Sequence, residues 1–156
     1  MYELRRVTIN DAKLLFDWAN DDKVRATAIV KKEIGWDEHI NWLINKLQSD
    51  QSYIYILTDD KNENIGVVRF DEDGEFFVIS YSIDKSHRKK GMGQLILQLG
   101  CKKMKSIAPQ CKKYKASVQT NNVASIKIFE KLGFLMKKTE IIEGNKFNLY
   151  YKDENG

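Results

Sequence analysis

Cysteine, proline and long apolar runs are scarce in this chain. Its 2 cysteines, Cys101 and Cys111, are too few for a disulfide framework or a zinc site, and they indicate a reducing compartment. No apolar stretch approaches the roughly 18–20 residues that span a bilayer, and the charged residues 1–6 contain no signal-peptide core. We therefore expect a cytoplasmic protein with no metal site and no membrane partner.

The composition is that of a folded domain with an uneven charge distribution. The chain has 156 residues, of which 42% are hydrophobic and 31% charged, and its net charge is +4. Lysine and arginine crowd residues 84–115, where Asp84 is the sole acid. Such a patch suits a ligand with several phosphates or a nucleic acid. Because no zinc-finger or aromatic RNA-reading motif accompanies the lysines, we expect no nucleic-acid partner and keep a basic nucleic-acid-binding domain as an alternative.

Hydrophobic periodicity predicts a single α/β layered domain over residues 1–156. Thr8 and Asp11 form a capping-box pattern at the start of the first helix. Residues 23–34 read as irregular, and neither a repeat nor a linker interrupts the chain. The expected strands are 2–7, 53–57, 65–70, 76–83, 114–118, 135–142 and 147–151, and the expected helices are 8–20, 36–47, 91–108 and 123–132.

The most informative stretch joins the strand 76–83 to the helix that follows it. Four basic residues, Lys85, Arg88, Lys89 and Lys90, precede two glycines set one apart at the first turn of that helix. Glycines let a ligand approach the backbone, and free N–H groups at a helix N-terminus attract anions. A nucleotide P-loop is excluded, because the lysine that must follow its second glycine is missing. A dinucleotide-binding fingerprint is also excluded, because both its third small residue and the acidic residue expected about 20 residues later are missing.

The segment Arg88-Lys89-Lys90-Gly91-Met92-Gly93 resembles the Arg/Gln-x-x-Gly-x-Gly/Ala signature of the GCN5-related N-acetyltransferase (GNAT) family. A second segment, residues 122–134, resembles another signature of that family in the right order and spacing. The resemblance implies a mixed, mostly antiparallel sheet of about seven strands flanked by about four helices, in the order βααβββαβαββ. It also implies acetyl-CoA as co-substrate, a primary amine as acceptor and no metal.

The resemblance also implies which residues meet the cofactor. Backbone groups at the end of the strand 76–83 would hold the pantetheine arm and polarise the acetyl carbonyl. The glycine loop would hold the pyrophosphate, and the last helix would contact the cofactor from the other side. The residues so assigned are Tyr81, Ser82, Ile83, Arg88, Lys89, Lys90, Gly91, Met92, Gly93, Asn122, Ser125 and Lys131.

Proton handling departs from the family pattern. Phe129 stands where many members have a tyrosine acid, and Val78 stands where many have a glutamate base. The catalytic residues therefore stay open, with Tyr81, Ser82 and His39 as candidates. A catalytically silent acyl-CoA-binding module is the alternative from another class.

The N-terminal third points to the acceptor. Residues 16–25, 36–42 and 53–56 resemble acetyltransferases that act on nucleotide-linked amino sugars of pseudaminic- and legionaminic-acid-type pathways. Trp18, Arg25, Trp36 and Trp42 could stack on a base or sugar and pair with phosphate, and the tryptophans could equally be packing residues. The alternative acceptor is a protein N-terminal amine, as in ribosomal-protein acetyltransferases. We expect a small-molecule acceptor and self-association as a homodimer.

Overall fold

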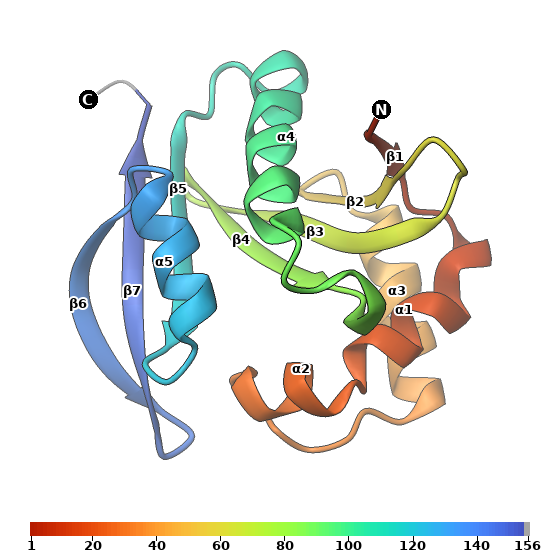
Figure 1. The fold of residues 1–156 in the computed structure, drawn as a ribbon, viewed down its shortest axis with the longest axis horizontal. Coiled ribbons are helices and arrows are strands. Elements are labelled where there is room, and N and C mark those ends of the chain that lie inside the picture. Colours follow the sequence, from red (N-terminus) through yellow and green to blue (C-terminus); the bar gives the residue numbers. More distant parts are fainter. Residues whose placement is uncertain (155–156) are drawn as a thin grey trace.

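Seven strands form one mixed sheet in the computed structural model, which describes residues 1–154 (Figure 1). Their order is β1-β2-β3-β4-β5-β7-β6, and only β4 and β5 run parallel to each other among the paired strands described. This arrangement confirms the expected mostly antiparallel sheet. The strands are β1 (Glu3–Arg6), β2 (Ser52–Thr58), β3 (Asn64–Asp73), β4 (Phe76–Ile83), β5 (Lys113–Gln119), β6 (Leu135–Ile142) and β7 (Asn145–Asp153).

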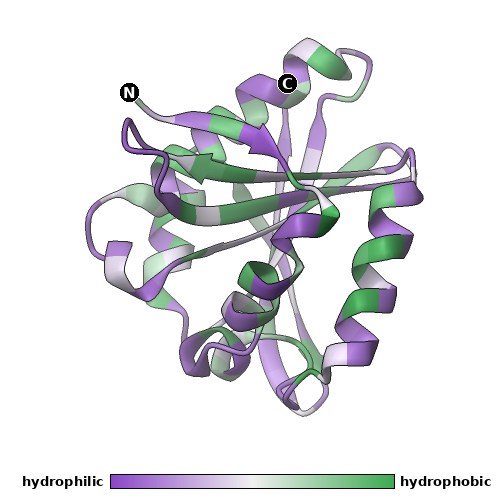
Figure 2. Ribbon diagram, turned by 90° about the vertical axis from the view of Figure 1, so that its right-hand side faces the viewer, coloured by the Kyte–Doolittle hydropathy of each residue, from purple (hydrophilic) through white to green (hydrophobic). Residues whose placement is uncertain are grey.

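Helices cover both faces of the sheet. One face carries α4 (Met92–Ile107) and α5 (Val123–Lys131), and the other carries α1 (Ala12–Ala19) and α3 (Trp36–Gln48), while the short α2 (Asp22–Thr27) lies beside the sheet (Figure 1). The helices show hydrophobic and hydrophilic stripes in Figure 2, as expected of helices that bury one side. Among residues 1–154, no helix combines the length and apolarity that crossing a bilayer requires.

The prediction of an irregular segment over residues 23–34 was wrong at its start, where the structure has α2. Asp21 caps this helix by accepting hydrogen bonds from the backbone N–H groups of Lys23 and Val24. The helix is only 6 residues long and buries none of them. Since it has no apolar stripe, periodicity could not reveal it, and the element order becomes βαααβββαβαββ.

The predicted start of the first helix is confirmed in a tighter form. Thr8 and Asp11 make the reciprocal capping box, but the first turn, η1 (Ile9–Asp11), is a 3₁₀ helix, and α1 begins at Ala12. Arg5 holds the Asp11 carboxylate at 2.8 and 3.0 Å. The buried Asp11 therefore ties the end of β1 to the helix layer.

Two apolar clusters, one on each face, hold the layers together. Phe70, Phe77 and Tyr114 lie in the larger cluster, under α4, and meet mostly edge to face at 6.1–6.2 Å. The smaller cluster joins α1 and α3 to β2 through Leu15, Leu43 and other fully buried side chains. The site lies where the sheet separating these clusters is interrupted.

That interruption is the divergence of β4 from β5. The two parallel strands pair only from Phe76–Val78 to residues 113–115. Beyond Val78 the backbone of β4 has no ladder partner on this side within the described chain, although its pairing with β3 continues to Ile83. A gap thus opens between residues 79–83 of β4 and residues 116–119 of β5.

Candidate active site

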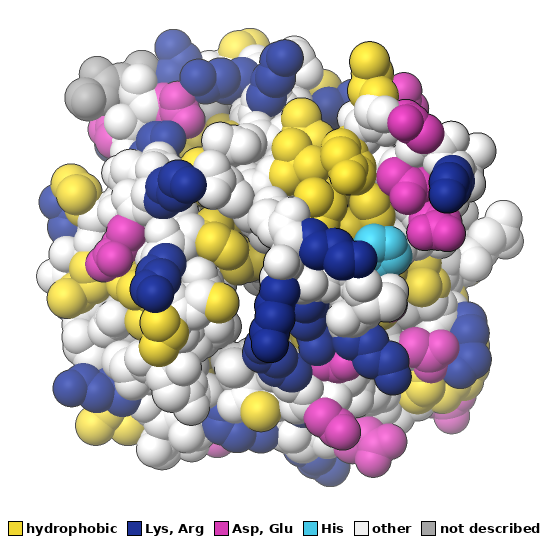
Figure 3. All heavy atoms as spheres, in the orientation of Figure 1, with side chains coloured by type: hydrophobic (Ala, Val, Ile, Leu, Met, Phe, Trp, Pro, Cys, Tyr) yellow, Lys and Arg dark blue, Asp and Glu magenta, His cyan; other side chains and the backbone are white. Residues whose placement is uncertain are grey.

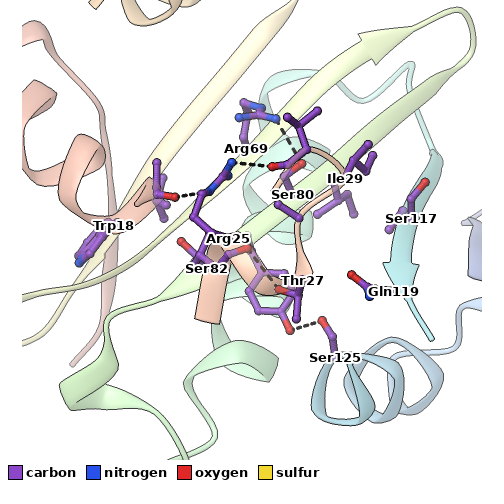
Figure 4. A pocket seen from close by; sticks show the side chains of 18 of the residues that line it. Trp18, Arg25, Thr27, Ile29, Arg69, Ser80, Ser82, Ser117, Gln119 and Ser125 are labelled. Carbon is purple, nitrogen blue, oxygen red and sulfur yellow. Dashed lines mark hydrogen bonds between the residues drawn. The ribbon is translucent and has the colours of Figure 1, made fainter. Parts of the chain in front are cut away.

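A cavity of about 650 Å³ fills the gap between the two strands (Figure 4). Its walls come from the diverging halves of β4 and β5, from the start of α5, from α1 and α3, and from α2 with the chain after it. The sequence-predicted residues that line it are Trp18, Arg25, His39, Trp42, Tyr81, Ser82, Asn122 and Ser125.

Strand alternation divides the cavity into two halves, one on each face of the sheet. Tyr81 lies toward α4 and α5, where its ring meets Phe129 edge to face at 6.0 Å. Ser80 and Ser82 have the opposite parity and lie toward α1–α3, as Ser117 of β5 does. We name these the α4/α5 half and the α1–α3 half.

The antiparallel ladder also determines where the backbone of β4 points. The N–H of Asp84 donates to Ile65 at 2.8 Å, in register with the β3–β4 pairing. Because hydrogen-bonded and non-hydrogen-bonded pairs alternate, the N–H of Ser82 faces β3, whereas those of Tyr81 and Ile83 face the gap. Two backbone donors, the N–H groups of Tyr81 and Ile83, therefore point into the gap between the strands.

The glycine loop leads into α4 with its N–H groups uncapped. Gly91 is the N-cap in the left-handed region, at φ 78°, and no side chain caps the helix. Gly93 is buried, and a Cβ there would lie 2.8 Å from Ile128 and 3.2 Å from Tyr81. The backbone thus offers the open helix N-terminus that binds phosphate.

Basic side chains surround this loop. Lysines and arginines gather beside a hollow in the middle of the face shown in Figure 3, over the segment between β4 and α4. Lys89 and Lys90 are exposed, and so is Lys131 at the end of α5. Arg88 instead donates to the Ile83 carbonyl at 3.0 Å and to the Asp21 carboxylate at 2.8 Å. This arginine is already engaged within the protein.

Tyr81 and Ser125 form a hydroxyl pair in the α4/α5 half. Their oxygens are 2.6 Å apart. Burial raises the pKa of Tyr81, so the phenol stays protonated at neutral pH. Asn122 caps α5 by accepting from the Ser125 N–H at 3.3 Å, which fixes this serine beneath the tyrosine. Sequence analysis named each residue separately and did not predict the pair.

The three tryptophans have different environments. Trp18 is buried, and its indole N–H donates to Asp84 at 2.8 Å. Trp42 lines the cavity, with the Arg69 guanidinium 5.1 Å from its ring. Trp36 is 44% exposed and lies outside the cavity wall, packed edge to face on Phe16. Two of the three, Trp18 and Trp42, thus line the cavity.

Arg25 and His39 line the cavity but serve structural contacts. Arg25 donates to the carbonyls of Ala19, Val30 and Lys32, which shapes the chain after α2. The ring of His39 is 3% exposed, and its Nε2–H donates to the Ala12 carbonyl at 2.9 Å. Burial lowers the pKa of His39, so the ring is neutral at neutral pH with one nitrogen occupied.

Apart from Ser82, the polar side chains that the strands contribute to the α1–α3 half of the cavity were not predicted from the sequence. Arg69 donates to Ser80 at 3.4 Å, and Ser117 and Gln119 project from β5 on the same face (Figure 4). Period-two alternation could have grouped Ser80 with Ser82. Nothing local in the sequence shows that β5 faces them across a gap.

One cluster outside the cavity has the side chains of a cation site. Ligand atoms of Asp59, Glu63 and His87 lie within 4.8 Å of one another. Asp59 already accepts backbone N–H groups of Lys61 and Glu63, which lowers its pKa, and Glu63 is exposed. These contacts account for Asp59 and Glu63 as part of the turn between β2 and β3, and His87 approaches Glu63 to 3.5 Å from the segment before α4.

One protein family matches most of this chain. The acetyltransferase (GNAT) domain family matches residues 2–135. An uncharacterized protein of Methanocaldococcus jannaschii, MJ1062, is 29% identical over 150 residues, and this match spans 88% of the chain but only 28% of that relative.

Solved structures show the same fold. A domain from Methanocaldococcus jannaschii is 26% identical with a TM-score of 0.84, and 98% of each chain is covered. Spermidine N-acetyltransferase from Vibrio cholerae, solved with CoA and spermine, has a TM-score of 0.88 at 15% identity, with 99% of this chain and 96% of that one covered. The split sheet, the uncapped glycine loop and the family match together show that the chain belongs to the GNAT family of acetyl-CoA-dependent N-acetyltransferases.

Proposed function

We propose that this domain acetylates the amine of a nucleotide-linked amino sugar. One observation carries the proposal, the polar lining of the α1–α3 half. Hydroxyl and amide groups of Ser80, Ser82, Ser117, Gln119 and Thr27 face this space. Such groups match the hydroxyls of a sugar.

The charges of the lining support an anionic acceptor over a polycation. Arg25 and Arg69 line the cavity, and Glu38 is the only carboxylate in its wall among the described residues. The Nε–H of Arg69 donates to Asp71 at 2.7 Å, which leaves N–H groups of the other guanidinium nitrogens of Arg69 for a ligand. A polyamine such as spermine needs several carboxylates around it, whereas the diphosphate of a nucleotide sugar is attracted to arginine. The spermine bound by the Vibrio cholerae enzyme therefore does not extend to this chain.

The proposed chemistry uses the two halves separately. Acetyl-CoA supplies the thioester from the α4/α5 half, and the free amine attacks its carbonyl from the α1–α3 half. The N–H groups of Tyr81 and Ile83 stabilise the oxyanion. The Tyr81 phenol protonates the departing thiolate, with Ser125 as its partner. The amine proton passes to water, and water returns a proton to Tyr81.

A thiol-release assay tests the acceptor. The panel contains an amino-sugar nucleotide, the same amino sugar without its nucleotide, spermidine and a peptide with a free N-terminus. We expect the highest kcat/KM with the nucleotide form. Preference for the peptide would favour the protein N-terminal alternative, and CoA binding without turnover on any acceptor would favour the silent module.

We also propose that the domain forms a homodimer through the edge strand β6. Leu135, Met136 and Ile141 are 61%, 51% and 77% exposed on this strand, which pairs only with β7 in the described chain. An unpaired edge that exposes apolar side chains can pair with a second copy, although the edge also carries the charged Lys137 and Lys138. Sedimentation should show a dimer that Ile141→Lys converts to monomer, and a monomeric native protein would refute this interface.

A cytoplasmic location completes the proposal. Cys101 and Cys111 are both free thiols. Burial raises the pKa of Cys101 to about 12, which keeps it as an unreactive thiol. Both features suit a protein of the reducing cytoplasm.

A further inference from the structure

The segment 22–34, which we call the lid, covers the α1–α3 half with little apolar anchoring. It comprises α2 and the chain that leads to α3, and six of its residues besides Arg25 line the cavity: Val24, Thr27, Ala28, Ile29, Val30 and Ile34. None of the α2 residues is buried, and Ile29 and Val30 are exposed. A segment with so little buried apolar surface opens at low free-energy cost. Polar links must therefore determine its position.

The link at the start of the lid joins it to the cofactor loop. The Asp21 carboxylate accepts from Arg88 at 2.8 Å, and both side chains are largely buried, at 18% and 22% exposure. The same carboxylate caps α2 through Lys23 and Val24. Burial acts to raise the pKa of Asp21, but the Arg88 hydrogen bond and the capping N–H groups lower it overall, so the ion pair persists at neutral pH.

A second contact fixes the base from which the lid extends. Trp18, near the end of α1, donates to Asp84, which begins the cofactor loop and caps η2 (Lys85–His87). Arg88 is meanwhile held to the end of β4 through the Ile83 carbonyl. Loop and lid thus share one hydrogen-bonded junction, which Asp21 connects to the start of α2. Away from the cofactor loop, the lid is also held by Arg25, which donates to the Ala19 carbonyl, and by Lys31, which donates to Gln119 of β5 at 2.6 Å.

We infer that Asp21 is a positioning residue that transmits cofactor binding to the acceptor lid. When CoA orders the loop around Gly91, Arg88 is held more firmly, and its existing pair with Asp21 keeps the lid in place over the α1–α3 half. Because coupling between sites is reciprocal, an acceptor that closes the lid tightens CoA binding by the same factor. This inference rests on the proposed placement of CoA at the glycine loop.

Hydrogen exchange of the intact protein, with and without CoA, tests the coupling without knowledge of the acceptor. In the native protein, CoA should slow amide exchange at residues 91–95, which report cofactor binding, and about fivefold or more across the lid. Asp21→Asn keeps a good helix cap but removes the charge that holds Arg88. In this variant we expect protection at 91–95 to remain and CoA-dependent protection of the lid to disappear.

Asp22→Asn is the matched control. It makes the same charge change one residue later, at an exposed position that makes no contact with Arg88 in the described structure, so its lid should respond as in the native protein. Protection at 91–95 without lid protection in the native protein would overturn the coupling alone. The coupling also fails if Asp21→Asn keeps lid protection. No protection at 91–95 would instead overturn the cofactor placement, and the coupling with it.

Discussion

If CoA binds at the glycine loop as proposed, Gly91 is the residue on which its binding depends most directly. Its φ of 78° lies in the left-handed region, and open space surrounds its Cα. A side chain at this position would project from the helix N-terminus where the phosphates would lie. The backbone strain of a non-glycine residue here costs about 1 kcal/mol, which the domain can tolerate.

Gly91→Glu should therefore abolish CoA binding through charge and bulk while leaving the fold intact. Calorimetric titration with CoA measures the loss. The control is Gly74→Glu, because Gly74 has a similar φ of 62°, equally open surroundings and a place in the β3–β4 turn. The Gly74→Glu variant should lose as much stability as Gly91→Glu but keep the native CoA affinity. An equal loss of CoA affinity in both variants would contradict the assignment of the glycine loop to the cofactor.

Tyr81 is the residue whose side chain would take part in the chemical step, since its hydroxyl would protonate the thiolate. Tyr81→Phe should lower kcat about tenfold, less than the usual contribution of a general acid because a CoA thiolate leaves readily. Burial raises the pKa of Tyr81, so the hydroxyl should not cause an alkaline decline below about pH 10.

Tyr150→Phe provides the comparison for that kinetic measurement. Tyr150 stacks on the same Phe129 at 6.1 Å, but its hydroxyl accepts from Asn148 outside the cavity wall. Its kcat should match the native value. A Tyr81→Phe variant with unchanged kcat would show that the thiolate departs unaided.

At the scale of elements, the sequence predicted those helices and strands whose position depends on neighbouring residues in the chain. The alternation in Phe76–Ile83 and the glycines at 91 and 93 placed β4 and the start of α4 to within one residue. The divergence of β4 from β5 could not be predicted from the sequence, because it arises from pairings between distant segments. For the same reason the faces of Ser80 and Ser117 meet only in the folded sheet.

The stability of the fold should depend on pH through one buried imidazole ring between α1 and α3. His39 lies between the two helices, and burial lowers its pKa below the ordinary 6.5. The unfolded chain therefore binds a proton more readily than the native state does. Above pH 6.5 the stabilisation is complete, and it is lost as the pH falls below 6.5 through the lower native pKa.

Melting temperatures measured between about pH 7.5 and 5 check this expectation. Stability should fall toward the acid end in the native protein, and less in His39→Gln, whose amide can still donate to Ala12. An identical slope in His39→Gln would show that other groups cause the acid loss.

For the molecule as a whole, the question is whether its overall charge or a local cluster attracts the cofactor. A net charge of +4 produces a weak general attraction for polyphosphates, whereas the lysines at the glycine loop act within a few ångströms. Raising the ionic strength from about 0.01 M to 0.15 M shortens the Debye length from about 30 Å to 8 Å. CoA affinity should fall about tenfold over this range.

Two double variants with equal charge separate the two sources of attraction. Lys89→Gln/Lys90→Gln removes charge at the loop, and Lys137→Gln/Lys138→Gln removes the same charge from exposed positions on β6. Titrations at both ionic strengths should show a weaker salt dependence for the loop variant and a native one for the β6 variant. Equal effects of the two would assign the attraction to net charge, and the basic residues beside the cavity would then have no special part in binding CoA.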